Sequence, residues 1–91
     1  MVTREYPGEL AEQFGRNLKR ARRRVGFSQE ELASVCNMHR TAIGLLENGD
    51  RLPRLDTIIK VASGASIEPA TLLDGMGWYV GMGHAGGFFV S

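Results

Sequence analysis

The chain has 91 residues, a formal net charge of +1 and hydrophobic residues at 43% of its positions. This length suits one domain with a modest core, and a single cysteine excludes an internal disulfide. Because no apolar run approaches the about 20 residues that span a bilayer and the first residues lack a signal-peptide core, we expect a cytoplasmic protein without a membrane partner.

Positive charge is concentrated in the first part of the chain. Residues 1–54 contain ten of the eleven Lys and Arg residues, against seven acidic residues, whereas residues 55–91 contain one Lys and three acidic residues. Attraction to phosphate is local, because salt screens charges beyond about 10 Å at 0.1 M. The basic first part is therefore the part to examine for nucleic-acid binding.

The first 24 residues predict a flexible arm, residues 1–8, followed by a helix over about 9–24. Apolar residues recur in this helix at intervals of three and four, which is typical of an amphipathic helix: Leu10, Phe14, Leu18, Ala21 and Val25. The same segment carries a run of basic residues, for which a solvent-exposed helix face and contacts to phosphate are equally good interpretations. These residues are Arg16, Lys19, Arg20, Arg22, Arg23 and Arg24.

Arg22 differs from its basic neighbours because it falls on the apolar stripe, four residues after Leu18. A lone charge at a buried position is costly, so Arg22 requires a partner. Glu47 lies beside Leu46 on the inner face of a later predicted helix. We therefore predict an Arg22–Glu47 ion pair that fixes the orientation of the two helices.

A short helix is predicted to begin after Ser28. Ser28 and Glu31, three positions later, have the spacing of a capping box. Leu32, Val35 and Cys36 then fall at helical spacing and predict one buried face.

The residues after this helix predict a tight turn and a second helix. Asn37 readily adopts the left-handed backbone that can end a helix. The second helix is expected from about Arg40, with Ile43 and Leu46 facing inward and Gly49 just past its end. Two short helices joined in this way predict a helix-turn-helix, whose second helix can enter a DNA major groove.

Two further helices are predicted before the tail. Pro53 precedes a helix over about 55–63, whose apolar stripe is Leu55, Ile58, Ile59 and Ala62. Glu68-Pro69 then opens a short fifth helix through Leu73, which is expected to add Leu72 and Leu73 to the core.

The tail, residues 75–91, is rich in glycine and carries no Asp, Glu, Lys or Arg. Two apolar triplets separated by glycines predict two small β-strands in a hairpin. A two-stranded hairpin is marginal alone, so the tail should pack on the helices or on another subunit, and we favour dimerisation. The candidate dimer contacts are Trp78, Tyr79, Val80, Phe88, Phe89 and Val90.

Residues from about 10 to 74 resemble the Xre family, the Cro- and phage-repressor-type helix-turn-helix proteins. The matching features recur in order: Leu18-Lys19 with Arg22, the segment from Gly26 to Ala33, Ile43, the segment from Leu46 to Gly49, Pro53 and Leu72-Leu73. The resemblance implies an all-α, five-helix, lambda-repressor-like domain over residues 9–74, with the tail as an extension. It also implies sequence-specific binding of double-stranded DNA, as a homodimer on a palindromic operator.

The resemblance assigns site residues by position. Base contacts would come from Arg40, Thr41, Gly44 and Leu45, and contacts to the DNA backbone from Gln29, His39, Asn48, Arg51 and Arg54. Arg40 suits a bidentate contact to guanine, and Thr41 and Leu45 suit thymine methyl groups. Leu45 is equally compatible with a flank of the interface or a subunit contact.

The sequence is also compatible with a class of function other than a repressor-like regulator, and it argues against a second class. One is a protein-interaction module or antitoxin that keeps the fold and binds DNA weakly or not at all, with a partner such as a toxin or RNA polymerase. The other is an enzyme, but no residue set implies a catalytic cleft. Cys36 and His39 leave only His84 as a further soft ligand, too few for a four-ligand zinc site. We expect no catalysis, cofactor or metal.

Overall fold

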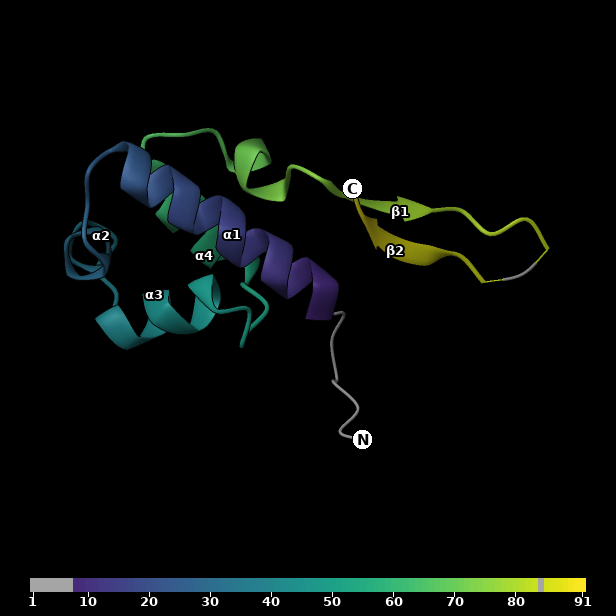
Figure 1. The fold of residues 1–91 in the computed structure, drawn as a ribbon, viewed down its shortest axis with the longest axis horizontal. Coiled ribbons are helices and arrows are strands. Elements are labelled where there is room, and N and C mark those ends of the chain that lie inside the picture. The colour runs from purple at the N-terminus through teal and green to yellow at the C-terminus, as the bar shows by residue number, and fades with distance from the viewer. Residues whose placement is uncertain (1–7, 84) are drawn as a thin grey trace.

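Four α-helices precede a short 3₁₀ helix and a β-hairpin in the computed structural model, which describes residues 8–83 and 85–91 (Figure 1). The elements are α1 (Gly8–Arg24), α2 (Gln29–Val35), α3 (Arg40–Glu47), α4 (Leu55–Gly64), η1 (Pro69–Leu73), β1 (Met76–Tyr79) and β2 (Gly87–Val90). The predicted arm lies outside the described residues except for Gly8, which already belongs to α1. In the part of the chain so described, no helix is both long and apolar enough to cross a membrane.

One hydrophobic core lies between α1, α2, α3, α4 and η1. Its largest fully buried side chains come from all five of these elements: Phe14, Leu18, Leu32, Ile43, Leu46, Val61 and Leu72. The apolar stripe predicted for α1 supplies two of them, and the inner residues predicted for α3 supply two more. The helical stripes therefore identify the central contacts of the domain.

Four residues predicted for the core are on the surface. Val35, Leu55, Ile59 and Leu73 are 59%, 75%, 52% and 45% exposed. In a domain of this size, other elements cover only one side of α2 and of α4. The apolar residues of each helix extend around more of its surface than this covered side, so some of them remain exposed. These four predictions were wrong.

The predicted fifth α-helix is a single 3₁₀ segment, η1. The N–H of Thr71 donates to the carbonyl of Glu68 at 3.0 Å, which is the i to i+3 spacing of a 3₁₀ turn. Pro69 at its start lacks an N–H, and the segment of five residues ends before Gly75, whose φ is +84°. The described residues therefore form four α-helices, one 3₁₀ segment and a two-stranded sheet, and not an all-α fold of five helices.

The two strands predicted in the tail are present as an antiparallel hairpin that projects from the helical part (Figure 1). In its register Met76 pairs with Val90, Trp78 with Phe88, and Tyr79 with Gly87. Trp78 and Phe88 contact edge to face on one side of the ribbon, with ring centroids 4.8 Å apart. Figure 1 shows the hairpin extending beyond the N-terminal end of α1, away from α2.

Asn17 joins the helical part to the base of the hairpin. Asn17 belongs to α1 and is buried. Its Nδ2 donates to the carbonyls of Leu72 at 3.0 Å and Asp74 at 2.9 Å. The N–H of Ser91 donates to the carbonyl of Gly75 at 2.7 Å and closes the strands at their base. The segment between η1 and β1 is thereby held to α1.

Candidate nucleic-acid interface

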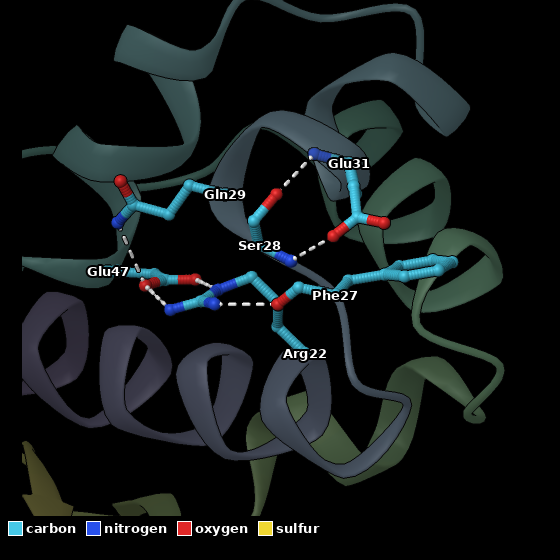
Figure 2. Close-up of polar contacts among 6 residues, drawn as sticks. All are labelled: Arg22, Phe27, Ser28, Gln29, Glu31 and Glu47. Atoms are coloured by element: carbon cyan, nitrogen blue, oxygen red, sulfur yellow. Dashed lines mark hydrogen bonds and ion pairs between the residues drawn. The ribbon is translucent and has the colours of Figure 1, made fainter.

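A capping box fixes the start of α2, as the sequence predicts. Ser28 Oγ accepts from the N–H of Glu31 at 3.0 Å, and Glu31 Oε1 accepts from the N–H of Ser28 at 2.9 Å (Figure 2). The hydrogen bonds from Ser28 lower the pKa of the Glu31 carboxyl, because they stabilise its charged form. The box satisfies two backbone donors at the point where Gln29 begins the helix.

The turn between α2 and α3 depends on a left-handed residue, Asn37, whose φ is +54°. Asparagine accepts this conformation more readily than other residues with a Cβ. The N–H of Met38 then donates to the carbonyl of Ala33 at 2.8 Å, and His39 precedes α3 with an extended backbone. The two helices are thus joined by a turn of only four residues, 36–39.

A buried ion pair ties α1 to α3. Arg22 Nε donates to Glu47 Oε2 at 2.6 Å and Arg22 Nη2 donates to Glu47 Oε1 at 3.0 Å, so the predicted pair is present and bidentate (Figure 2). Both residues are buried, and the hydrogen bond to Glu47 raises the pKa of Arg22. Such a pair favours one orientation of the two helices more than it adds net stability.

Two further hydrogen bonds extend this ion pair to α2. Gln29 Nε2 donates to Glu47 Oε1 at 3.1 Å, and Arg22 Nη1 donates to the carbonyl of Phe27 at 2.8 Å (Figure 2). One carboxylate therefore accepts from side chains on both α1 and α2. The sequence placed Gln29 at the start of α2 but gave no sign that its amide contacts Glu47.

Helices α1 and α3 also touch through their backbones at Gly15. A Cβ built on Gly15 would lie 2.6 Å from the carbonyl oxygen of Leu46 and closer still to that of Glu47, distances that real Cβ atoms do not show. Only glycine fits this crossing. The role of Gly15 was not predicted from the sequence, although a glycine inside a helical pattern is a signal of close packing.

The outer side of α3 and the first residue of α2 form one shallow concave surface. It is lined by Gln29, Arg40, Thr41, Gly44, Leu45 and Asn48. Arg40, Thr41 and Asn48 are exposed, whereas Gln29, Gly44 and Leu45 are partly buried. The structure therefore brings together six of the nine predicted DNA-contact residues.

The remaining three predicted contacts, His39, Arg51 and Arg54, are exposed but do not line this surface. Arg54 Nε lies 3.4 Å from Asp56 Oδ1, in a solvent-exposed pair of the kind that contributes little. A separate basic stripe on α1, formed by Arg16, Lys19, Arg20 and Arg23, also lies outside the concave surface.

The residues weighed as metal ligands do not form a cluster in the described structure. Cys36 is buried, its Sγ donates to the carbonyl of Lys60 at 3.4 Å, and burial raises the pKa of its thiol. His39 is exposed, and His84 lies outside the described residues. Among the described residues, no three His, Cys, Asp or Glu side chains are grouped to hold a metal ion.

Known proteins share this arrangement. A family model described as helix-turn-helix, HTH_3, matches residues 18–72. The control protein C.BamHI of Bacillus amyloliquefaciens is 39% identical over 62 residues, which are 67% of this chain and 76% of that protein. The restriction-modification controller protein C.AhdI from Aeromonas hydrophila has a similar structure, with a TM-score of 0.66 and 37% identity over 68% of this chain and 94% of that chain.

A third similar structure is the hypothetical transcription factor NHTF from Neisseria. Its TM-score is 0.68 at 29% identity, over 80% of this chain and 86% of that chain. The family match contains the concave surface and the Arg22–Glu47 pair, and it ends before β1.

Proposed function

The chain belongs to the helix-turn-helix family HTH_3, and from that premise we propose that it is a regulator of transcription that binds double-stranded DNA sequence-specifically. The observation that carries the proposal is the concave surface at α3. Exposed polar side chains line this surface, and the Arg22–Glu47 pair on the opposite, buried side of α3 fixes the orientation of the helix. A helix held in this way can lie in a major groove and meet the same bases each time.

Within this proposal, Arg40, Thr41, Gly44 and Leu45 contact base edges. Arg40 is exposed and has no carboxylate partner among the described residues, so its guanidinium is available for the bidentate contact that guanine offers. Thr41 and Leu45 present methyl groups to thymine. The contacts to the DNA backbone come from Gln29, His39, Asn48, Arg51 and Arg54.

Gly44 supports a close approach of DNA to α3. A Cβ built on Gly44 would have a single neighbour within 4 Å, Gln29 Oε1 at 3.9 Å, so the fold itself does not require glycine there. Glycine inside a helix costs about 1 kcal/mol relative to alanine. A base edge close to the helix backbone would explain why this cost is accepted.

Selection of bound sites from random duplex DNA tests the proposal with the purified protein. We expect a palindrome with half-sites about one helical turn apart, since the proposed form on DNA is a homodimer. Arg40→Ala should relax the preference at one base position, whereas Gln29→Ala should weaken binding to all sequences alike. Equal effects of the two substitutions would contradict the assigned roles.

Salt dependence separates this function from a protein-interaction module with the same fold. Binding to random duplex DNA should weaken steeply between two salt concentrations, because each neutralised phosphate releases counterions. Absence of binding at low salt would instead favour the interaction module.

Among classes of regulator, the relatives favour a controller of a restriction-modification system. Two of them are named a control protein and a restriction-modification controller protein. Footprinting on the DNA around the gene for this chain tests this assignment. Protection upstream of an endonuclease or methyltransferase gene is expected, and sites elsewhere only would contradict it.

A further inference from the structure

We propose that the basic stripe on α1 is a second DNA-binding surface, which holds the phosphate backbone of a duplex other than the one that α3 contacts. Four residues form the stripe and line one shallow hollow: Arg16, Lys19, Arg20 and Arg23. None of them lines the concave surface at α3. The inference rests on the proposed function only for the duplex at α3, and the stripe itself can be tested without an operator.

The charge of the stripe is available to a ligand. All four residues are exposed. Lys19, Arg20 and Arg23 form no ion pair in the part of the chain that the structure describes. No acidic residue follows Glu12 in α1, so no carboxylate of this helix lies within the stripe.

The stripe places like charges next to one another. Arg16 and Arg20 are four residues apart, as are Lys19 and Arg23, and like charges at this spacing destabilise a helix. A bound polyanion reduces this repulsion, because its negative charges lie beside the basic groups. The free protein therefore carries an unfavourable arrangement that a ligand with several negative charges would relieve.

The stripe faces away from the concave surface. At about 100° per residue, its four side chains fall within an arc of roughly 100° on the side of α1 opposite the buried Phe14 and Leu18. Gly15 and Arg22, which contact α3, lie roughly 100° from the centre of this arc. A duplex at α3 therefore leaves the stripe accessible to a separate duplex.

The spacing and the chemistry of the stripe suit a sugar-phosphate backbone. From Arg16 to Arg23 the helix rises by about 10 Å. One strand of a duplex presents about three phosphates over this length, at about 3.4 Å of axis each. Three of the four residues are arginine, whose planar guanidinium matches two phosphate oxygens. Contacts to the backbone alone do not read sequence, so this surface binds duplexes without preference.

An acidic protein and an anionic membrane are the rival partners. The centre of a protein interface is apolar and poor in charge, but none of the exposed large apolar residues belongs to α1. A helix that lies on a membrane requires an exposed apolar face, whereas the apolar side chains of α1 are buried in the core. A surface of arginine and lysine alone favours the phosphate backbone.

Binding of random duplex DNA at low salt tests the stripe without an operator. Arg20→Glu reverses one charge of the stripe, and Lys60→Glu makes the same change at an exposed residue of α4 that lines neither surface. Arg20→Glu should weaken binding at least about fivefold more than Lys60→Glu does. It should also reduce the slope of log K against log salt by about 1, the contribution of one phosphate contact. Equal effects of the two variants would overturn the proposal.

Thermal melts of the free protein provide the folding control. Arg20→Glu should melt no lower than the unmodified protein, because the new carboxylate lies next to Arg16 and Arg23 on the helix. A loss of DNA binding in this variant is then not a loss of folding.

Retention of two duplexes at once tests whether the stripe acts while α3 is occupied. A selected operator duplex is immobilised and saturated with protein, and labelled random duplex is then added. The unmodified protein and Lys60→Glu should retain the label, whereas Arg20→Glu should retain at least about fivefold less for the same amount of bound protein. No retention by the unmodified protein, or equal retention by Arg20→Glu, would overturn the proposal.

Two further outcomes separate the alternatives. Polyglutamate that displaces the label as efficiently as unlabelled random duplex would assign the stripe to an acidic protein and overturn the proposal. Failure to select any operator would contradict the function proposed for α3 instead. The comparison of Arg20→Glu with Lys60→Glu on random duplex would then still decide whether the stripe binds DNA.

Discussion

The Glu47 carboxylate determines how three parts of the domain are placed relative to one another. It accepts two hydrogen bonds from Arg22 on α1 and one from Gln29 on α2, while it belongs to the last turn of α3. Gln29 and α3 both contribute to the concave surface. A residue that does not line this surface thus determines the relative position of two elements that do.

Glu47→Ala should destabilise the domain strongly. The substitution leaves the buried Arg22 guanidinium without its counter-ion, and breaking a buried pair costs about 3–5 kcal/mol. Denaturant unfolding followed by circular dichroism measures the loss. Glu30→Ala removes an exposed carboxylate from α2 and should change the free energy of unfolding by less than about 0.5 kcal/mol. Equal stability of Glu47→Ala and the unmodified protein would refute a structural role for the pair.

Glu31 predicts a pH-dependent contribution to stability. Its pKa is lowered in the folded state by hydrogen bonds from Ser28, so the carboxylate stabilises the fold at neutral pH. This contribution is fully present above the unfolded-state pKa of Glu31 and is lost as the pH falls through its lowered folded-state pKa. The unmodified protein should therefore melt above Glu31→Gln at pH 7, and the difference should vanish in acid. A constant difference across this range would show that the charge of Glu31 is unimportant.

At the scale of helices and turns, local signals predicted the start of α2 and the turn after it. The capping box of Ser28 and Glu31 and the left-handed conformation of Asn37 each depend on residues that are close in sequence. The sequence alone therefore predicts where α2 begins and where the turn follows. The Arg22–Glu47 pair was also predictable, because a charge on an apolar stripe requires a partner on another inner face.

Features that depend on the packing of distant segments were not predicted. The exposure of Val35 and Leu55 depends on how much of α2 and α4 the other helices cover, which periodicity does not specify. Segment η1 adopts a 3₁₀ form because the five residues from Pro69 to Leu73 are too few to complete α-helical turns. The close approach at Gly15 and the Gln29–Glu47 bond exist only once α1, α2 and α3 are assembled.

Two glycine-to-alanine substitutions should have opposite effects on stability. Gly15→Ala places a Cβ against the carbonyls of Leu46 and Glu47 and should cost about 1–3 kcal/mol, as overpacking does. The methyl group of Gly44→Ala would have only Gln29 Oε1 as a neighbour, at an ordinary contact distance of 3.9 Å, so the substitution should stabilise the protein by about 0.5–1 kcal/mol through helix propensity. Thermal melts of the two variants compare the effects directly.

Gly44→Ala also tests the proposed approach of DNA to α3. Gly44→Ala should bind the selected operator more weakly although it is more stable, which a loss of folding cannot explain. Unchanged operator affinity of Gly44→Ala would mean that DNA does not approach the helix at this position.

At the scale of the molecule, residues 8–83 and 85–91 form a helical part and a projecting hairpin, which are joined at Asn17 and Gly75. Trp78 is the only tryptophan of the chain, so its fluorescence reports on the hairpin, whereas far-ultraviolet circular dichroism reports mainly on the helices. The two parts can therefore be followed separately during unfolding.

Gly77→Ala should loosen the hairpin and leave the helical part intact. The ring of Phe89 lies against Gly77 so closely that a Cβ there would overlap it, and neither residue belongs to the buried core cluster of the helices. The fluorescence of Trp78 should change at a lower temperature than the circular dichroism signal. Coincident transitions at a lowered melting temperature would show instead that hairpin and helices unfold as one unit.

The backbone contact at Gly15 has a thermodynamic consequence for operator binding. At Gly15, helix α1 meets the carbonyls of Leu46 and Glu47 without an intervening side chain, and this contact together with the Arg22–Glu47 pair opposes sliding of α1 along α3. Adjustment between these two helices and the operator should then come from deformation of the duplex rather than from a change in how α1 and α3 pack. Calorimetry at several temperatures should accordingly give a heat capacity change that reflects the contact area alone, without the larger negative term that accompanies folding upon binding.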